Sequence, residues 1–180
     1  MTIYIGLLRG INVGGHKKIK MASLKQHLSD DGLEGVTTYI QSGNLIFQSR
    51  KKEAALESLI ANCILTHFGF NVPVLVRSLA FIESLFEHNP FHDCDLKTVA
   101  ATILSDPPDK KSRDSLQARD FSPDRLKILT DVAYLHYPNG SIKSKLTISL
   151  MEKQFGVQAT NRNWNTITKL LALGRAMQDA

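Results

Sequence analysis

The order of strand-like and helix-like segments in the first 77 residues constrains the fold of this chain more than any other feature. Hydrophobic periodicity predicts strands over residues 3–8, 36–41, 44–48 and 72–77, and helices over residues 21–30 and 52–68. In chain order these segments read β-α-β-β-α-β, the split βαβ order of a ferredoxin-like unit. The order therefore predicts a four-stranded antiparallel sheet with both helices on one face.

A similar pattern begins again after a connecting helix predicted over residues 79–87. Strands are predicted over residues 98–104, 126–130 and 132–137, and helices over residues 109–119, 144–155 and 164–177. The second half thus reads β-α-β-β-α and ends in a helix where an eighth strand would complete the repeat. We predict an α+β protein of two ferredoxin-like-related subdomains, one over residues 1–78 and one over residues 79–180 that ends in a helix pair.

Composition and cysteine usage are those of an ordinary globular protein in a reducing compartment. Of 180 residues, 43% are hydrophobic and 22% are charged, and no apolar stretch is long enough to cross a bilayer. The apolar run Met1–Leu8 lacks the basic segment and cleavage site of a signal peptide. Cys63 and Cys94 form no CxxC pair, which favours free thiols. We therefore predict a cytoplasmic location and no membrane association.

The net charge of +5 comes from the two ends of the chain. Residues 1–50 carry a balance of +3 and residues 140–180 a balance of +4, whereas the segment between them carries −2. A basic excess of this size is compatible with nucleic acid or another anion as a partner. Candidate anion-binding residues are therefore concentrated in the two terminal segments.

A glycine- and lysine-rich loop between the first strand and the first helix is one candidate site. Glycines allow backbone N–H groups to approach a ligand, and a following helix start adds partial positive charge. The spacing is not that of a P-loop, because His16 stands where that motif has its lysine. A flexible, solvated loop would explain the same residues. The candidates in this loop are Arg9, Asn12, Gly14, Gly15 and Lys18.

The segment Thr160–Lys169 is a second candidate site. Asn163 suits the cap of the last helix, and Arg162 just before it would add a bidentate donor for phosphate or carboxylate. Four side chains are placed away from the buried stripe of this helix: Arg162, Asn165, Thr166 and Lys169. Ser144 and Lys145 offer a similar cap and cation at the start of the preceding predicted helix. The two closing helices, joined by a short turn, have lengths like those of a helix-turn-helix. Ordinary capping and surface ion pairs are the alternative.

The predicted hairpin turn carries more polar groups than a chain reversal needs. Gln41, Ser42 and Asn44 flank Gly43, which suits the positive φ of a tight turn. The three polar side chains join the candidate anion-binding set, with turn chemistry as the alternative.

Other chemistries find weaker support in the sequence. Residues 87–95 hold two histidines, a cysteine and several acids, but Pro90 breaks the helical spacing of His88 and His92. The chain has no nucleophile elbow, which argues against nucleophilic catalysis. The basic segments have no paired carboxylates, so the side chain in them that could carry a proton near neutral pH is His16. We predict no structural metal and no cofactor.

Six motifs follow one another along the chain: LLRGINVGG near the start, TYIQSGN at the hairpin, NPF at 89–91, YPNG at 137–140, SKL at 144–146 and TNRNWNTITKLLAL at the end. Together they resemble the bacterial domain-of-unknown-function family numbered 1697, from about Ile5 to Leu173. The resemblance implies two ferredoxin-related α+β halves and a small, soluble cytoplasmic bacterial protein, and it brings no established reaction. The signature residues of the family coincide with the polar clusters described above, together with Trp164.

The predicted function is binding of an anionic ligand, either nucleic acid or a phosphorylated metabolite, at a basic and amide-rich surface formed by the two ends. Convergence of Arg9, Asn44, Lys145 and Arg162 on one surface would support this function. Two alternatives stay open. One is an enzyme acting on a phosphate-bearing small molecule, with His16 as proton carrier, and the other is a structural or partner-binding module. The sequence leaves the oligomeric state open.

Overall fold

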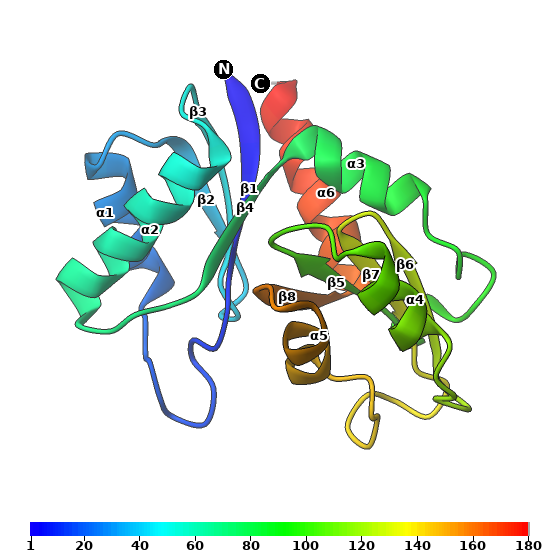
Figure 1. Cartoon of the computed structure of the whole chain (residues 1–180). Coiled ribbons are helices and arrows are strands. Elements are labelled where there is room, and N and C mark those ends of the chain that lie inside the picture. Colours follow the sequence, from blue (N-terminus) through cyan, green and yellow to red (C-terminus); the bar gives the residue numbers. More distant parts are fainter. Residues whose placement is uncertain (180) are drawn as a thin grey trace. The chain divides into compact units, whose positions relative to one another are not determined.

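The chain forms two compact units in this computed structural model, which describes residues 1–179 (Figure 1). The first unit comprises Met1–Ser84 together with the residues from Lys169 on, and the second comprises Leu85–Thr168. Each unit has a four-stranded antiparallel sheet of its own. The predicted fold class, α+β with two related halves, is confirmed.

The first unit has the predicted β-α-β-β-α-β order. Its elements are β1 (Thr2–Leu8), α1 (Met21–Asp30), β2 (Glu34–Tyr39), β3 (Asn44–Ser49), α2 (Glu53–Phe68) and β4 (Val74–Ser78), followed by the start of α3 (Leu79–Glu87). The strands lie in the order β2-β3-β1-β4, all antiparallel. Figure 1 shows α1 and α2 on the same side of this sheet. The sequence order thus predicts both the sheet and the placement of its helices.

Leucine and isoleucine side chains of α1 and α2 build the core of the first unit against the sheet. Leu24 and Leu28 of α1 and Leu56 and Ile60 of α2 are fully buried in one cluster with Leu45 of β3. Gly69, in the left-handed conformation at φ 80°, ends α2 as the sequence predicts.

Cys63 on the buried face of α2 makes the stability of the first unit sensitive to alkaline pH. Burial, assisted by a hydrogen bond to Asp31 and its charge, raises the pKa of the Cys63 thiol from 9.0 to about 12. Above pH 9 the unfolded chain therefore loses a proton that the folded chain keeps. The unfolding free energy should then fall by about 1.4 kcal/mol per pH unit until the folded thiol also ionises.

Urea unfolding at pH 7.5, 9 and 10 measures this effect, with Cys63→Ala as the comparison. The variant is expected to be less stable at pH 7.5, because it leaves a cavity, but to lose less stability between pH 9 and 10. Equal losses in the two proteins over that interval would contradict the assignment to Cys63.

The end of α6 (Trp164–Gln178) completes the first unit, although it is distant in sequence. Gly174 packs so closely on Leu79 that a Cβ at this position would meet the Leu79 side chain. Arg175 Nε lies 2.9 Å from Glu83 Oε1, and the methyl carbon of Met177 lies 3.6 Å from the place of a Cβ on Gly35. The first unit is therefore assembled from both ends of the chain.

The second unit repeats the same order of elements. It contains η1 (Leu96–Thr98), β5 (Val99–Leu104), α4 (Lys110–Gln117), β6 (Arg125–Leu129), β7 (Val132–His136), α5 (Ile148–Phe155) and β8 (Ala159–Asn163). Its sheet order, β6-β7-β5-β8, matches that of the first sheet. Leu116 of α4 and Met151 of α5 are buried in one cluster with the sheet residues Ala133 and Leu135.

Strand β8 adds an element that the sequence pattern did not predict. Ala159–Asn163 pairs along the full edge of β5, with Thr102 opposite Asn161 and Ala101 opposite Arg162. Because four of its five residues are polar, β8 lacks the apolar alternation that marks a half-buried strand, and only pairing with β5 defines it. The second half therefore reads β-α-β-β-α-β before its final helix.

Helix α5 begins four residues later than predicted. Thr147 caps it by accepting a hydrogen bond from Leu150 N at 3.1 Å, whereas Ser144 and Lys145 lie in the loop before it. Ser144 Oγ accepts instead from Leu146 N at 2.9 Å, which tightens that loop. The prediction of a helix start at Ser144 is wrong because two competing hydroxyl caps stand three residues apart.

The helices of residues 1–179 include none with the length and apolar character that a bilayer span requires.

Candidate functional site

The side chain of Asn12 closes the glycine- and lysine-rich loop between β1 and α1. Asn12 Oδ1 accepts from Ile19 N at 2.8 Å, and Asn12 Nδ2 donates to Ile19 O at 3.2 Å and to Gln41 O at 2.8 Å. Asn12 itself has a φ of 54°, in the left-handed region that asparagine tolerates better than most residues. This clasp, made by one amide, ties the loop to the start of α1 and to the β2–β3 turn.

A pocket of about 930 Å³ lies between this loop and the start of α1. Four of the predicted site residues line it: Asn12, Gly15, Lys18 and Gln41. Lys20 and the first turn of α1, Met21 to Ser23, form another part of its wall, and Phe68 adds an aromatic ring. Loop, hairpin and helix-start residues thus line one pocket of the first unit, and anion binding by these residues stays a prediction.

The first backbone N–H groups of α1, whose residues line this pocket, have no side-chain acceptor among the described residues. Lys20 is the N-cap residue, no side chain caps the helix among the described residues, and the first turn contains no acid. The leading N–H groups of a helix carry partial positive charge and need an acceptor. The wall of the pocket is therefore rich in donors and cations, with Lys18 and Lys20 exposed beside the helix start.

Other residues of this loop, among them the predicted site residues Gly14 and Arg9, serve its fold. Gly14 lies in the tight turn where His16 N donates to Val13 O at 3.0 Å. Lys17 Nζ donates to Asn71 O at 2.7 Å and lies 6.0 Å from the centre of the Phe70 ring. Arg9, half-buried after β1, has its backbone N–H bonded to Pro73 O at 3.1 Å. None of these residues, including His16, belongs to the described lining of the pocket.

The hairpin residues are held mainly by the turn itself. Asn44 is fully buried, and its Nδ2 donates to Tyr39 O at 3.0 Å and to Ser42 Oγ at 3.1 Å. Gly43 has a φ of 83° and its carbonyl accepts from Leu8 N at 2.8 Å. Of the three polar candidates, Gln41 is the one that reaches the pocket. Turn chemistry explains Ser42 and Asn44.

In the second unit Arg162 is buried rather than turned toward solvent. It lies within β8, is 8% exposed, and its Nη1 donates to Thr160 Oγ1 at 2.9 Å and to Asn161 O at 2.8 Å. Burial lowers the pKa of the Arg162 guanidinium to about 10. Arg77 occupies the corresponding place in β4, one residue before the strand ends, and pairs with Glu53 and Glu57 at 3.8 and 3.5 Å. A buried arginine at this place is thus a shared element of the two folds.

The prediction of a helix-turn-helix is wrong. Strand β8 separates α5 from α6, and two of the four side chains placed on its recognition helix, Arg162 and Thr166, are buried. Asn163 does cap α6, because its Oδ1 accepts from Thr166 N at 2.8 Å. Lys145 and Lys169 are exposed.

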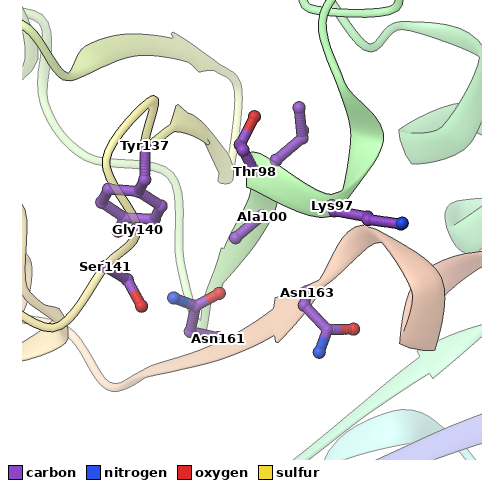
Figure 2. Close-up of a pocket in the computed structure, with 9 residues that line it drawn as sticks. Lys97, Thr98, Ala100, Tyr137, Gly140, Ser141, Asn161 and Asn163 are labelled. Atoms are coloured by element: carbon purple, nitrogen blue, oxygen red, sulfur yellow. The ribbon is translucent and has the colours of Figure 1, made fainter.

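A second pocket, of about 290 Å³, lies in the second unit where η1, β5, β8 and the loop after β7 meet (Figure 2). Its side chains include Lys97, Tyr137, Ser141, Asn161 and Asn163. Only Asn163 belongs to the predicted set. Sequence reasoning missed Asn161 because β8 was not expected, whereas the YPNG motif at 137–140 was a usable signal for this loop.

The acidic and histidine-rich segment around Pro90 is held by a hydrogen bond within the segment and by a cation–π contact. Asn89 Oδ1 accepts from Phe91 N at 2.9 Å, and the Arg125 guanidinium lies 4.7 Å from the Phe91 ring centre. Within residues 1–179 no group of three or more His, Cys, Asp or Glu side chains is placed to hold a metal ion.

Two four-stranded units of one topology, with a pocket in each, define a small two-unit α+β protein. The chain belongs to the family described as "Protein of unknown function (DUF1697)", whose model matches residues 1–134. Among solved structures it is similar to the conserved bacterial protein SP0830 from Streptococcus pneumoniae, with 27% sequence identity and a TM-score of 0.76, over 95% of this chain and 97% of that one. No match is found among the curated proteins.

Proposed function

We propose that this protein binds a phosphate-bearing small molecule in the pocket at the start of α1. The observation that carries the proposal is a helix start that lacks a side-chain cap and a first-turn acid and opens on a pocket lined by Lys18 and Lys20. A phosphate group would accept hydrogen bonds from the first N–H groups of α1 and neutralise the two lysines.

The shape and lining of the pocket favour a small molecule over a nucleic acid. Asn12 and Gln41 offer amide groups, and Met21 and Phe68 offer apolar surface, next to the two lysines. A concave site with an apolar part and a few directed polar groups suits a compact organic phosphate. Nucleic acid would instead use an extended row of cations, and its binding would weaken steeply with added salt.

The test exploits the first turn of α1. Ala22 is exposed and lines the pocket, so Ala22→Glu places a carboxylate where the phosphate would lie. A first-turn acid favours the helix, so the variant should be at least as stable as the wild type. Phosphate binding should nevertheless weaken by about tenfold or more, since a charge-assisted hydrogen bond contributes about 1.5–3 kcal/mol.

Binding is measured by the shift of the thermal unfolding midpoint with inorganic phosphate, pyrophosphate and a panel of sugar and nucleoside phosphates. Lys25→Ala, on the exposed surface of α1 outside the pocket, is the matched control and should bind as the wild type does. Stabilisation of Ala22→Glu equal to that of the wild type would overturn the proposal. Binding of labelled RNA or DNA, together with no response to the small phosphates, would show that the ligand is a nucleic acid and would overturn the small-molecule proposal.

A further inference from the structure

The pocket of the second unit contains a buried polar atom that the fold leaves without a partner. Asn161 Oδ1 is closed off from solvent and has no hydrogen bond within the described residues. Thr102 Oγ1 is in the same condition, and Thr102 stands directly opposite Asn161 in the β5–β8 register. Each such oxygen costs about 1–3 kcal/mol relative to a hydrogen-bonded one. Two of them side by side on one sheet face indicate that Asn161 is not there for stability.

The rest of the described pocket wall combines polar side chains with Val99 and Ala100 and contains no carboxylate. In Figure 2 the Asn161 amide and the Ser141 side chain lie on the same side of the cavity, below the Tyr137 ring. Tyr137 is buried and its hydroxyl donates to Leu146 O at 2.9 Å, which fixes the ring as a wall. Lys97 supplies the cationic side chain of the lining.

This lining selects the chemistry of the ligand. The amide of Asn161 offers one acceptor and one donor group in a plane, so its complement is a planar edge with a donor next to an acceptor. Nucleobase edges have this pattern, as an amino group beside a ring nitrogen in adenine and cytosine or as a ring N–H beside a carbonyl in uracil and guanine. Asparagine reads adenine in this bidentate manner in nucleic-acid complexes. Aromatic side chains are frequent neighbours of bound bases, and Tyr137 supplies one here.

We propose that this pocket binds a nucleobase through an edge that places a hydrogen-bond donor next to an acceptor, with Asn161 as the residue that reads the edge. Rotation about the Cβ–Cγ bond, a broad torsion, brings the amide oxygen to the donor of the ligand and Nδ2 to the neighbouring acceptor. Lys97 would meet a phosphate on the same ligand, so a nucleoside monophosphate should bind better than the nucleoside. The inference does not depend on the pocket at α1, which lies in the other unit.

Saturation-transfer NMR and titration calorimetry with adenosine, N6,N6-dimethyladenosine, cytidine, uridine and AMP test this inference on the full chain. Adenosine and cytidine should bind, uridine can bind through its N3–H and O4, and N6,N6-dimethyladenosine, which has no amino N–H to donate, should bind roughly 10-fold more weakly than adenosine. Asn161→Leu removes the amide at similar size, and it should reduce adenosine binding at least tenfold while unfolding at the same temperature as the wild type or higher.

Two further variants keep the result decisive. Ser141→Trp fills the pocket from an exposed loop position and should also abolish binding, so that it serves if Asn161→Leu folds poorly. Asn165→Leu removes an exposed amide outside the pocket and should bind as the wild type does. Equal affinity for N6,N6-dimethyladenosine and adenosine, or unchanged adenosine binding in Ser141→Trp, would overturn the proposal. Ala22→Glu should leave nucleoside binding intact, which separates this site from the phosphate pocket.

Discussion

Replacement of Gly43 by alanine is expected to destabilise the first unit by about 3 kcal/mol. A Cβ on Gly43 would lie 2.6 Å from Leu8 Cβ and 2.8 Å from Ile11 Cδ1, and both neighbours are buried in the core of the unit. Overpacking of this kind costs about 1–3 kcal/mol. The φ of 83° adds about 1–2 kcal/mol for any residue with a side chain.

Gly32→Ala separates these two contributions. Gly32 has a similar φ of 89°, but nothing lies within 4 Å of the place of its Cβ. The control should therefore lose only about 1 kcal/mol, the cost of the backbone conformation. Urea unfolding of both variants measures the difference. If the two variants were equally stable, the close approach of Gly43 to Leu8 and Ile11 would not be a real constraint.

Replacement of Asn12 by alanine should cost about 3 kcal/mol and weaken phosphate binding as well. The substitution removes three hydrogen bonds, two of them to the backbone of Ile19, which is buried. The loss leaves the Ile19 N–H without an acceptor just before α1 begins, at a typical cost of about 1–3 kcal/mol. The left-handed φ of 54° adds strain that alanine tolerates poorly.

Asn12→Gly tests the clasp apart from the backbone strain. Glycine accepts the positive φ, so this variant should be about 1 kcal/mol more stable than Asn12→Ala yet still clearly less stable than the wild type. Hydrogen exchange at the Ile19 amide gives the local readout, because both variants should expose this N–H. Wild-type protection of Ile19 in Asn12→Gly would show that another group holds the loop.

The sequence pattern predicts the fold well where apolar residues repeat along one element. The bounds of α1 and α3 match their predicted residue ranges, because Leu24 and Leu28, or Ile82 and Leu85, mark a single buried face. Strand β8 was missed for the opposite reason. Its burial follows from pairing with β5, more than fifty residues earlier, and no local pattern in ATNRN carries that information.

The candidate site was partly predictable for similar physical reasons. Glycines and lysines before a helix indicate a donor-rich loop, and Asn12, Gly15, Lys18 and Gln41 do line one pocket. The sequence analysis placed Arg162 at the surface because charged side chains are normally exposed, whereas its position in β8 buries it. Asn161 could not be recognised before β8 was known. The prediction that both ends of the chain meet at one anion-binding surface stays a prediction.

The division of the first unit between the two ends of the chain fixes an order of events during synthesis. A ribosome releases residues 1–84 first, whereas Gly174, Arg175 and Met177, which pack on Leu79, Glu83 and Gly35, emerge only after the second unit. The surface of the first unit that packs against α6 therefore stays uncovered until the second unit has been synthesised. A stop codon or protease cut shortly before Lys169 would remove this late cover, and a chaperone would meet the chain at that surface.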